Sequence, residues 1–411
     1  MTDRRAAGLV LALIALANFG NFYVYDSIGP VADLLIRQRD FSQTQIGLLN
    51  AVYSLPNIVL LLFGGLMVDR FGAGRMLFWT GAVCLAGAIL TALGTGFHGM
   101  AAGRLLFGIG AETFNIATLT AIVRFFSGRH LAFAIALSIA IGRAGAFAVD
   151  LSPTWMPGAY ADGWQPPLLV AALFAALSFV AAACYWQLDH RHGTRSATPA
   201  ATEPRVSLRD IGGFAPAYWY LLGLSALWYA VIFAFRSTFA IAYFQHVHGL
   251  DLAAAGKING DVFLAAIFAT PALAWLADRS RRHAELLAAG ALFLPLAIAT
   301  LAESQFPPWI GTVMIGLSFS LVPAVLWPMT ARVVPAARLG TALGLMWSIQ
   351  SAAIAGANFA AGWLNDRFGA GESNPAGYGP MMNLFLAAAT AGFVLALLQL
   401  RPLDPRPQPE S

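Results

Sequence analysis

The sequence predicts an all-α membrane protein with twelve transmembrane helices, arranged as two pseudo-symmetric bundles of six. Three observations lead to this prediction. The 411 residues are 58% hydrophobic and only 11% charged, whereas a soluble domain carries about a quarter charged residues. The chain contains twelve apolar runs of about the length that a bilayer crossing needs. Related strings also recur at matching places in the two halves, as in carriers built from repeats.

The apolar runs fall into two sets of six, separated by a polar stretch. The first set lies near 8–36, 43–68, 76–95, 98–125, 130–154 and 166–188. The second set lies near 215–246, 251–277, 284–302, 308–334, 338–365 and 378–400. Residues 189–213 are polar, contain Pro, Ser and Thr and lack apolar periodicity, which is typical of a linker. We therefore expect bundles at 1–188 and 214–401, a linker at 189–213 and a polar tail at 402–411.

The distribution of arginine predicts the orientation of these helices. Basic residues gather in the segments that share a side with both termini, for example at Arg70, Arg75, Arg124 and Arg129. Cytoplasmic loops carry such an excess of basic residues. The arginine bias and the lack of Asn-x-Ser/Thr acceptor sites fit a bacterial chain. We expect an integral protein of the bacterial inner membrane with both termini in the cytoplasm.

The internal repeat includes a charged pair at the end of corresponding helices. Asp69 and Arg70 follow the second run, and Asp278 and Arg279 follow the eighth. The segment from Gly65 to Arg75 resembles the loop signature of the major facilitator superfamily, with one residue more before the final Arg75. The resemblance implies that these pairs latch helix ends on the cytoplasmic side when the carrier faces outward. The alternative is a solvated charged turn that only fixes topology.

Two opposite charges lie deep inside predicted spans. Glu112 and Arg143 are each roughly 20 Å along their helices from the membrane boundary. An ionisable residue at this depth is costly and therefore a candidate for function. The two side chains could bind the two ends of a zwitterion, since arginine can donate two parallel hydrogen bonds to a carboxylate. They could also pair with each other, and a purely structural salt bridge is the alternative reading.

Other ionisable residues are candidates for gating or ion coupling. Asp26 and Arg236 fall at corresponding depths in the outer half of the membrane, so they could face each other as a gate, as a second binding pair or as a static salt bridge. Asp261 could pair with Arg236 instead, and Asp150 is expected only to line the mouth of the cavity. No histidine lies at mid-depth, so any proton coupling would fall to Glu112, Asp26 or Asp261.

Aromatic and polar residues in the spans complete the expected binding cavity, although singly each is more often a packing residue. The candidates are Tyr25, Tyr53, Asn57, Trp228, Tyr229, Trp327, Trp347 and Gln350.

Several longer strings resemble one branch of the superfamily, the dipeptide carriers. They include FGNFYVYD in the first run, GRLLFGIGAE in the fourth, and IGLSFSLVPAVLWPMTARVVPAARLGTALGLMWSIQ across the tenth and eleventh. This resemblance implies uniport of short peptides, with Glu112 holding the amino end and Arg143 the carboxylate. The charges at Asp150, Arg236 and Asp261 depart from that branch.

The sequence therefore favours a secondary-active or facilitative transporter of small zwitterions, dipeptides in the first place, that works by alternating access. A proton-coupled carrier of organic anions is the first alternative, and a non-transporting ligand sensor is the second. Enzyme motifs such as H-E-x-x-H and G-x-S-x-G are absent from the sequence. We expect a monomer in the lipid bilayer with a small-molecule or dipeptide substrate, protons as an optional partner, and no cofactor, metal or nucleic acid.

Overall fold

The computed structural model describes residues 3–126, 128–191, 213–280, 282–303, 306–335 and 338–400. Over these residues the chain is helical, without a β-strand, and eleven of the helical stretches are long and apolar enough to cross a membrane. The predicted fold class is confirmed. Most of the predicted linker 189–213 and the whole tail 402–411 lie outside the described residues, so the predicted boundaries between the bundles stay a prediction.

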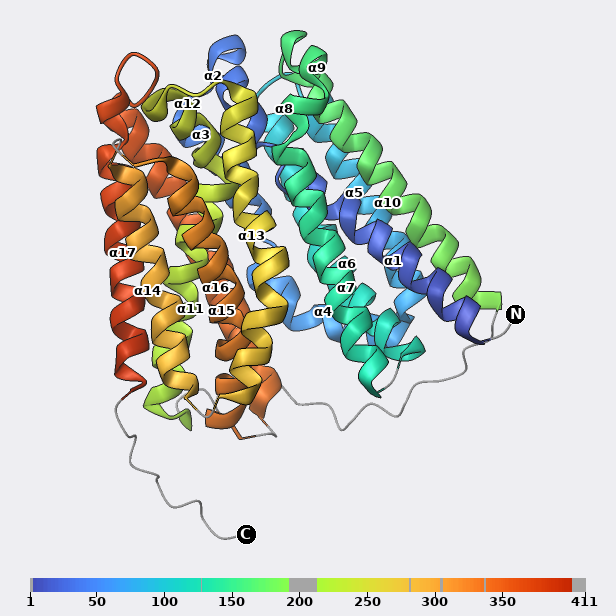
Figure 1. Ribbon diagram of the computed structural model, residues 1–411. Coiled ribbons are helices and arrows are strands. Elements are labelled where there is room, and N and C mark those ends of the chain that lie inside the picture. Colours follow the sequence, from blue (N-terminus) through green and yellow to red (C-terminus); the bar gives the residue numbers. More distant parts are fainter. Residues whose placement is uncertain are drawn as a thin grey trace.

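The long helices of the first half are joined by short helical turns (Figure 1). These elements are α1 (Asp3–Tyr25), η1 (Gly29–Val31), α2 (Ala32–Arg39), α3 (Gln43–Ser54), α4 (Asn57–Phe71), α5 (Ala73–Leu93), α6 (Phe97–Phe125), α7 (Gly128–Asp150), α8 (Ser152–Trp155), α9 (Pro157–Ala161) and α10 (Gln165–Arg191).

The second half repeats this pattern with one π-helical turn in its first long helix. The elements are α11 (Pro216–Ala234), the π turn η3 (Phe235–Phe239), α12 (Ala240–His248), α13 (Leu252–Arg279), α14 (His283–Ala302), α15 (Pro308–Val333), α16 (Leu339–Arg367), η5 (Pro375–Tyr378) and α17 (Gly379–Leu398).

The predicted second span is the one that differs from expectation. It is divided into α3 and α4 at Leu55 and Pro56, so that neither piece alone has the length of a span. Proline lacks the backbone N–H that a continuous helix needs at this position. The expected twelve spans therefore appear as eleven long helices plus this interrupted pair.

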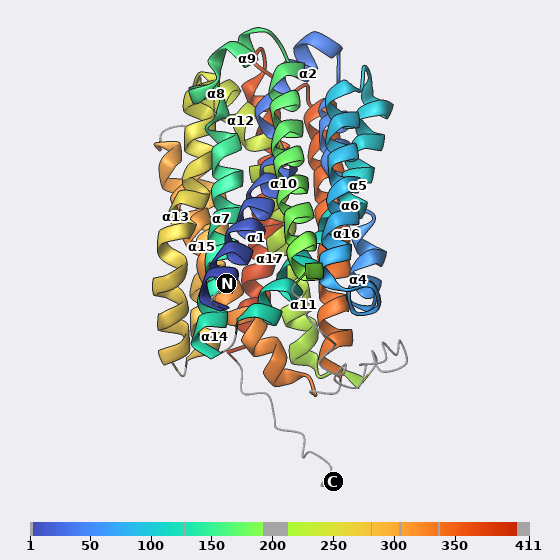
Figure 2. The ribbon, with the colours of Figure 1, turned by 90° about the vertical axis from the view of Figure 1, so that its right-hand side faces the viewer.

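The helices of the two halves approach each other closely at one end of the molecule only. In Figure 1, α1 begins and α17 ends at the lower end, which we call the terminal face; the opposite end, near α2 and α12, is the closed face. Helices α1, α5 and α10 lie together when the molecule is turned by 90° (Figure 2). The two groups of helices diverge from the closed face toward the terminal face (Figure 1).

Glycines allow the close approach between the halves. A Cβ atom at Gly47 on α3 would lie 2.2 Å from the carbonyl oxygen of Asn358 on α16. A Cβ atom at Gly256 on α13 would lie 2.2 Å from the carbonyl oxygen of Asp150 on α7. Both distances are too short for any side chain, so these backbones touch because glycine stands there.

Candidate functional site

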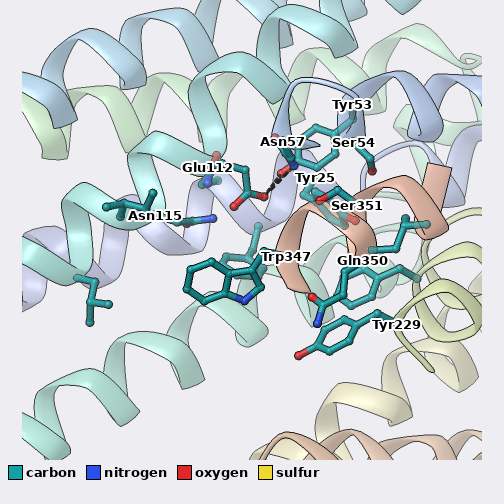
Figure 3. A pocket seen from close by; sticks show the side chains of 16 residues that line it. Tyr25, Tyr53, Ser54, Asn57, Glu112, Asn115, Tyr229, Trp347, Gln350 and Ser351 are labelled. Carbon is teal, nitrogen blue, oxygen red and sulfur yellow. Dashed lines mark hydrogen bonds between the residues drawn. The ribbon is translucent and has the colours of Figure 1, made fainter. Parts of the chain in front are cut away.

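A cavity of about 370 Å³ lies between the two halves. Helices α1, α3, α4 and α6 contribute one wall, and α11 and α16 contribute the other (Figure 3). Glu112 lines the cavity, together with six of the eight predicted aromatic and polar residues, namely Tyr25, Tyr53, Asn57, Tyr229, Trp347 and Gln350.

The cavity opens toward the terminal face. Its α6 wall descends from Glu112 to Leu119, and its α16 wall descends from Ile354 to Trp347. Leu119 and Trp347, at the terminal-face end of each wall, are 48% and 37% exposed. One turn beyond Ile354 on the closed side, Asn358 is buried, and its backbone carbonyl lies against Gly47 of the first half. The site is therefore accessible from one side of the protein.

Glu112 is the one charged side chain among the described residues that line the cavity. Asn57 Nδ2 donates to Glu112 Oε1 over 3.1 Å, and the Tyr53 hydroxyl donates to the same oxygen over 3.3 Å. Both partners are neutral, so they orient the carboxylate without cancelling its charge. Figure 3 shows Glu112 and Asn115 on one side of the cavity, with Tyr229, Trp347 and Gln350 opposite.

Arg143 lies behind the aromatic part of the wall and is absent from the cavity lining. Its Nη1 donates to Thr270 Oγ1 over 2.7 Å, and its guanidinium carbon lies 4.9 Å from the ring centre of Phe319. Tyr229 is close enough to interact with it electrostatically. Within the described part of the chain Arg143 has no carboxylate partner, so the expected pairing of Glu112 with Arg143 is not present in this conformation.

Of three further predicted lining residues, one lines the cavity and two lie outside its lining. Gln350 lines it and donates through Nε2 to Ser225 Oγ on α11. Trp327 is outside the lining, with its ring centre 5.9 Å from that of Trp347. Trp228 is buried behind the wall, where Nε1 donates to Ser318 Oγ over 2.9 Å.

Asp26 and Arg236 lie in contact on the closed side of the cavity. Arg236 Nη1 donates to Asp26 Oδ2, and Arg236 Nη2 donates to Asp150 Oδ2. All three side chains are 2% exposed. The expectation that Asp150 only lines the cavity mouth was wrong, because the end of α7 converges on the π turn that carries Arg236. Asp261 does not pair with Arg236; its nearest charge is Lys257 on the same helix.

The closed face is held by further polar contacts between the halves. The carboxylate of Asp366 on α16 accepts from the backbone N–H groups of Gln43 and Thr44, each over 2.8 Å, at the start of α3. Asn50 Nδ2 donates to Thr238 Oγ1 over 2.7 Å, and this hydroxyl donates to Asn358 Oδ1 over 2.6 Å. His246 Nε2 lies 3.0 Å from Asp33 Oδ1.

Comparison with known proteins decides the family. Residues 14–357 match the Major Facilitator Superfamily. The chain belongs to the major facilitator superfamily. The prediction that it is a transporter and not an enzyme is thereby confirmed, as is its place in the membrane.

Within the superfamily, the chain is similar to several characterised transporters. It is 30% identical over 376 residues to the lysosomal dipeptide transporter MFSD1 of Homo sapiens, covering 88% of this chain and 80% of that protein. It is also 30% identical over 373 residues to the MFSD1 of Danio rerio, covering 87% and 80%. It is 26% identical over 379 residues to the probable nitrate/nitrite transporter NarK2 of Mycobacterium tuberculosis, covering 83% and 85%.

Solved structures of other superfamily transporters share the fold. The peptide transporter POT in complex with sulfate superposes with a TM-score of 0.75 at 16% identity, covering 97% of each chain. A bacterial homologue of the human lysosomal transporter Spinster, in an inward-facing and unoccupied conformation, has a TM-score of 0.74 at 16% identity, covering 97% and 99%.

The superfamily loop signature lies on the terminal face, away from the cavity. The side chain of Asp69 lies outside the described residues. Arg70 is exposed, with its guanidinium carbon 5.4 Å from the ring centre of Phe71. In the second copy, Asp278 and Arg279 are exposed, and Arg279 lies over Trp275. A latching role in the opposite conformation of this superfamily member stays a prediction.

Sequence reasoning missed Asn115, Ser54 and Ser351, and it left the role of Arg104, which resembles an arginine signature of the superfamily, open. Asn115, one helical turn from Glu112, and Ser54 and Ser351 all line the cavity. The spacing from Glu112 was a usable signal for Asn115, since residues three apart share a helix face. Arg104, which could have been a snorkelling side chain at the boundary, is instead 1% exposed and donates to the carbonyl oxygens of Val24 and Tyr25.

Proposed function

We propose that this protein carries small zwitterions, dipeptides in the first place, by alternating access through the cavity at Glu112. One observation carries the proposal. Glu112 and Arg143 are an acid and a base near the same cavity, and each is held by neutral partners only among the described residues. Keeping two such charges uncompensated inside a membrane protein is costly, unless a ligand provides the opposite charges.

Each of the two charges has its own role in this proposal. Glu112 faces the cavity directly and receives the amino group of the ligand, with Oε2 free of the Asn57 and Tyr53 bonds. Arg143 receives the carboxylate after exchanging its bond to the neutral Thr270 hydroxyl for a charge-assisted one. The aromatic wall formed by Tyr229, Phe233 and Trp347 packs against the ligand between its ends. The name of the MFSD1 relatives supports a dipeptide as that ligand.

The negative charge in the cavity distinguishes this proposal from an organic-anion carrier. A site for a carboxylate alone would place a cation in the lining, whereas the charged lining residue here is Glu112. The positive charge of Arg143 lies one layer behind the wall.

Ligand-induced stabilisation tests the proposal. The purified protein is melted with free dipeptides, with the same dipeptides N-acetylated or C-amidated, and with simple carboxylates. A ligand at 100 times its Kd stabilises the folded form by about 2.7 kcal/mol. We expect stabilisation by free dipeptides, lost on blocking either end and lost in Glu112→Gln and in Arg143→Gln.

The matched control is Glu285→Gln, the same substitution at an exposed position beside Arg282. It should keep the full stabilisation by dipeptides. Stabilisation by carboxylates regardless of an amino group would overturn the dipeptide assignment in favour of an anion carrier. Binding without flux into liposomes would overturn the carrier role in favour of a sensor.

We further propose that the terminal face is cytoplasmic and that the protein resides in the inner membrane of a bacterium. The arginines of the terminal-face segments, including Arg70, Arg279 and Arg332, support this orientation. In that orientation the cavity is open to the cytoplasm and closed to the outside.

A further inference from the structure

Two buried carboxylates share one guanidinium at the closed side of the cavity. Asp26 follows α1 and Asp150 ends α7, both in the first half, and Arg236 lies on the π turn of the second half. Each of the three side chains is 2% exposed. With both carboxylates ionised, this cluster holds one negative charge more than its guanidinium can balance. A buried charge without a partner is strongly unfavourable.

The surroundings of the cluster contain few groups that could compensate this charge. Arg104 on α6 interacts electrostatically with Asp26, but its hydrogen bonds go to neutral acceptors, namely backbone carbonyls and Asn50 Oδ1. Tyr25 on α1 and Tyr160 on α9 are the neighbouring titratable groups, and both are neutral in their ordinary form. Asn259 on α13 donates to Asp150 Oδ1 over 3.0 Å. The guanidinium carbon of Arg236 lies 4.0 Å from the ring centre of Phe263.

Unpartnered polar atoms provide a second, independent sign of a missing ligand. Asp26 Oδ1 and Asn259 Oδ1 are buried acceptors without a hydrogen-bond donor, and Arg236 Nε is a buried donor without an acceptor. Asp26 and Asn259 are both 2% exposed and both belong to the cluster, since Asn259 bonds to Asp150 and Asp26 bonds to Arg236. Buried acceptors in proteins almost always have a donor. A proton on one of the two carboxylates would neutralise the excess negative charge. It would also provide a hydrogen-bond donor within the cluster.

We propose that the Asp26–Arg236–Asp150 cluster binds one proton when the closed face is closed, which makes closure of this face depend on pH. Two carboxylates that share a site do not both ionise readily, because like charges disfavour each other. Opening the closed face separates Arg236 from both aspartates and exposes them to water, where both ionise. The proton therefore binds the closed conformation more tightly, and lower pH favours that conformation. This inference shares with the proposed function only the alternation of the protein between two conformations, and it does not depend on which substrate is carried.

The conformational equilibrium can be measured without any substrate, so failure of this inference and failure of the dipeptide proposal are distinguishable. Spin labels at Asp162→Cys and Ser373→Cys, in a Cys84→Ala and Cys184→Ser background, report the distance across the closed face. Both label sites are exposed, one in each half. We expect the ratio of closed to open molecules to rise as the pH falls, by up to tenfold per pH unit over the titration of one proton.

A second titratable contact crosses the same face and must be removed. His246 lies against Asp33 and against the hydroxyl of Tyr378, with Arg37 and Glu372 beside them. The titration is therefore carried out in a His246→Gln background, where the slope assigned to the cluster should persist.

Asn is the neutral isostere that imitates a protonated aspartate. We expect Asp150→Asn to remove the pH dependence while retaining a closed population, because the bond to Arg236 and the neutral charge balance are both kept. Asp26→Asn should act in the same way and serves if Asp150→Asn does not fold. Asp261→Asn, on neighbouring α13 and apart from the cluster, should keep the dependence. A flat titration in the His246→Gln background, or an unchanged slope in both Asp150→Asn and Asp26→Asn, would overturn the proposal.

Discussion

At the scale of single residues, buried charges in this protein are of two kinds. Arg104 and Arg236 have their donors engaged by several acceptors and stabilise the fold of their half or the contact between halves. Glu112 and Arg143 have few and neutral partners and adjoin the cavity. The number of hydrogen-bond partners, more than burial, separates the structural charges from the candidate ligand-binding ones.

Truncation of a structural charge should destabilise the protein. Arg104→Ala leaves the carbonyl oxygens of Val24, Tyr25 and Leu49 without their side-chain donor, together with Asn50 Oδ1. Each buried acceptor that loses its donor costs about 1–3 kcal/mol, so we expect the free energy of unfolding to fall by at least ~2 kcal/mol. Chemical denaturation in detergent micelles measures this change.

The control for Arg104→Ala is Arg282→Ala, which removes an exposed arginine that pairs only with Glu285. Its effect should stay within about 0.5 kcal/mol, as for most surface substitutions. Equal losses for the two variants would contradict the structural role of Arg104.

The sequence identifies a charge in a span but not the direction in which it points. Glu112 and Arg143 are prominent because charges are rare there, and Glu112 lines the cavity, whereas Arg143 is absent from its lining. Their mutual pairing could not be decided, because it depends on the rotation of α7, which directs Arg143 toward Thr270 on α13. Nothing in the sequence selects Ser54 and Ser351 as cavity residues, because small polar residues are frequent between membrane helices whatever their role.

At the scale of elements, backbone contacts set the conformation of the closed face. The lengths of eleven helices followed from apolar runs, because the bilayer fixes how many residues a span needs. Two irregular elements were missed: the interruption of the second span at Pro56 and the π turn at Phe235–Phe239. A π turn has no clear residue signature, and yet it frequently marks a functional site. Here it directs Arg236 to Asp26 and also to Asp150.

A methyl group at one of the close contacts should open the closed face. In Gly47→Ala the new Cβ meets the carbonyl oxygen of Asn358 at 2.2 Å, so α3 and α16 must separate. We expect the spin-label pair at Asp162→Cys and Ser373→Cys to show a larger population at long distance. Gly356→Ala, on α16 with no atom within 4 Å of its Cβ, should leave the distances unchanged. The same distance distribution in both variants would show that this contact does not hold the face closed.

At the scale of the whole molecule, polar contacts between the halves gather at one face and the cavity opens at the other. Asp366, His246 and Arg236 all act across the closed face, each from the second half to the first. The architecture and its two-fold repeat could be predicted from the sequence. The conformation could not, because the same helices are compatible with either face being open.

The proposed orientation predicts which face is accessible from outside the cell. Ser373 lies between α16 and α17 at the closed face, and Ser280 follows α13 at the terminal face. We expect a membrane-impermeant maleimide to label Ser373→Cys in intact cells, and Ser280→Cys only after permeabilisation, both in the cysteine-free background. Labelling in the reverse order would mean that the arginine distribution does not set the topology.

The position of Glu112 in a cavity with one open end also determines how cargo length should be selected. In the proposed binding mode, a dipeptide places its amino group on Glu112 and its carboxylate on Arg143, and it is enclosed when the terminal face closes. A longer peptide can bind the same acid, but its remaining residues extend past Leu119 and Trp347 into the mouth. Such a molecule would prevent the two halves from closing at the terminal face. Chain length thus separates cargo from inhibitor, even where both compete for one carboxylate.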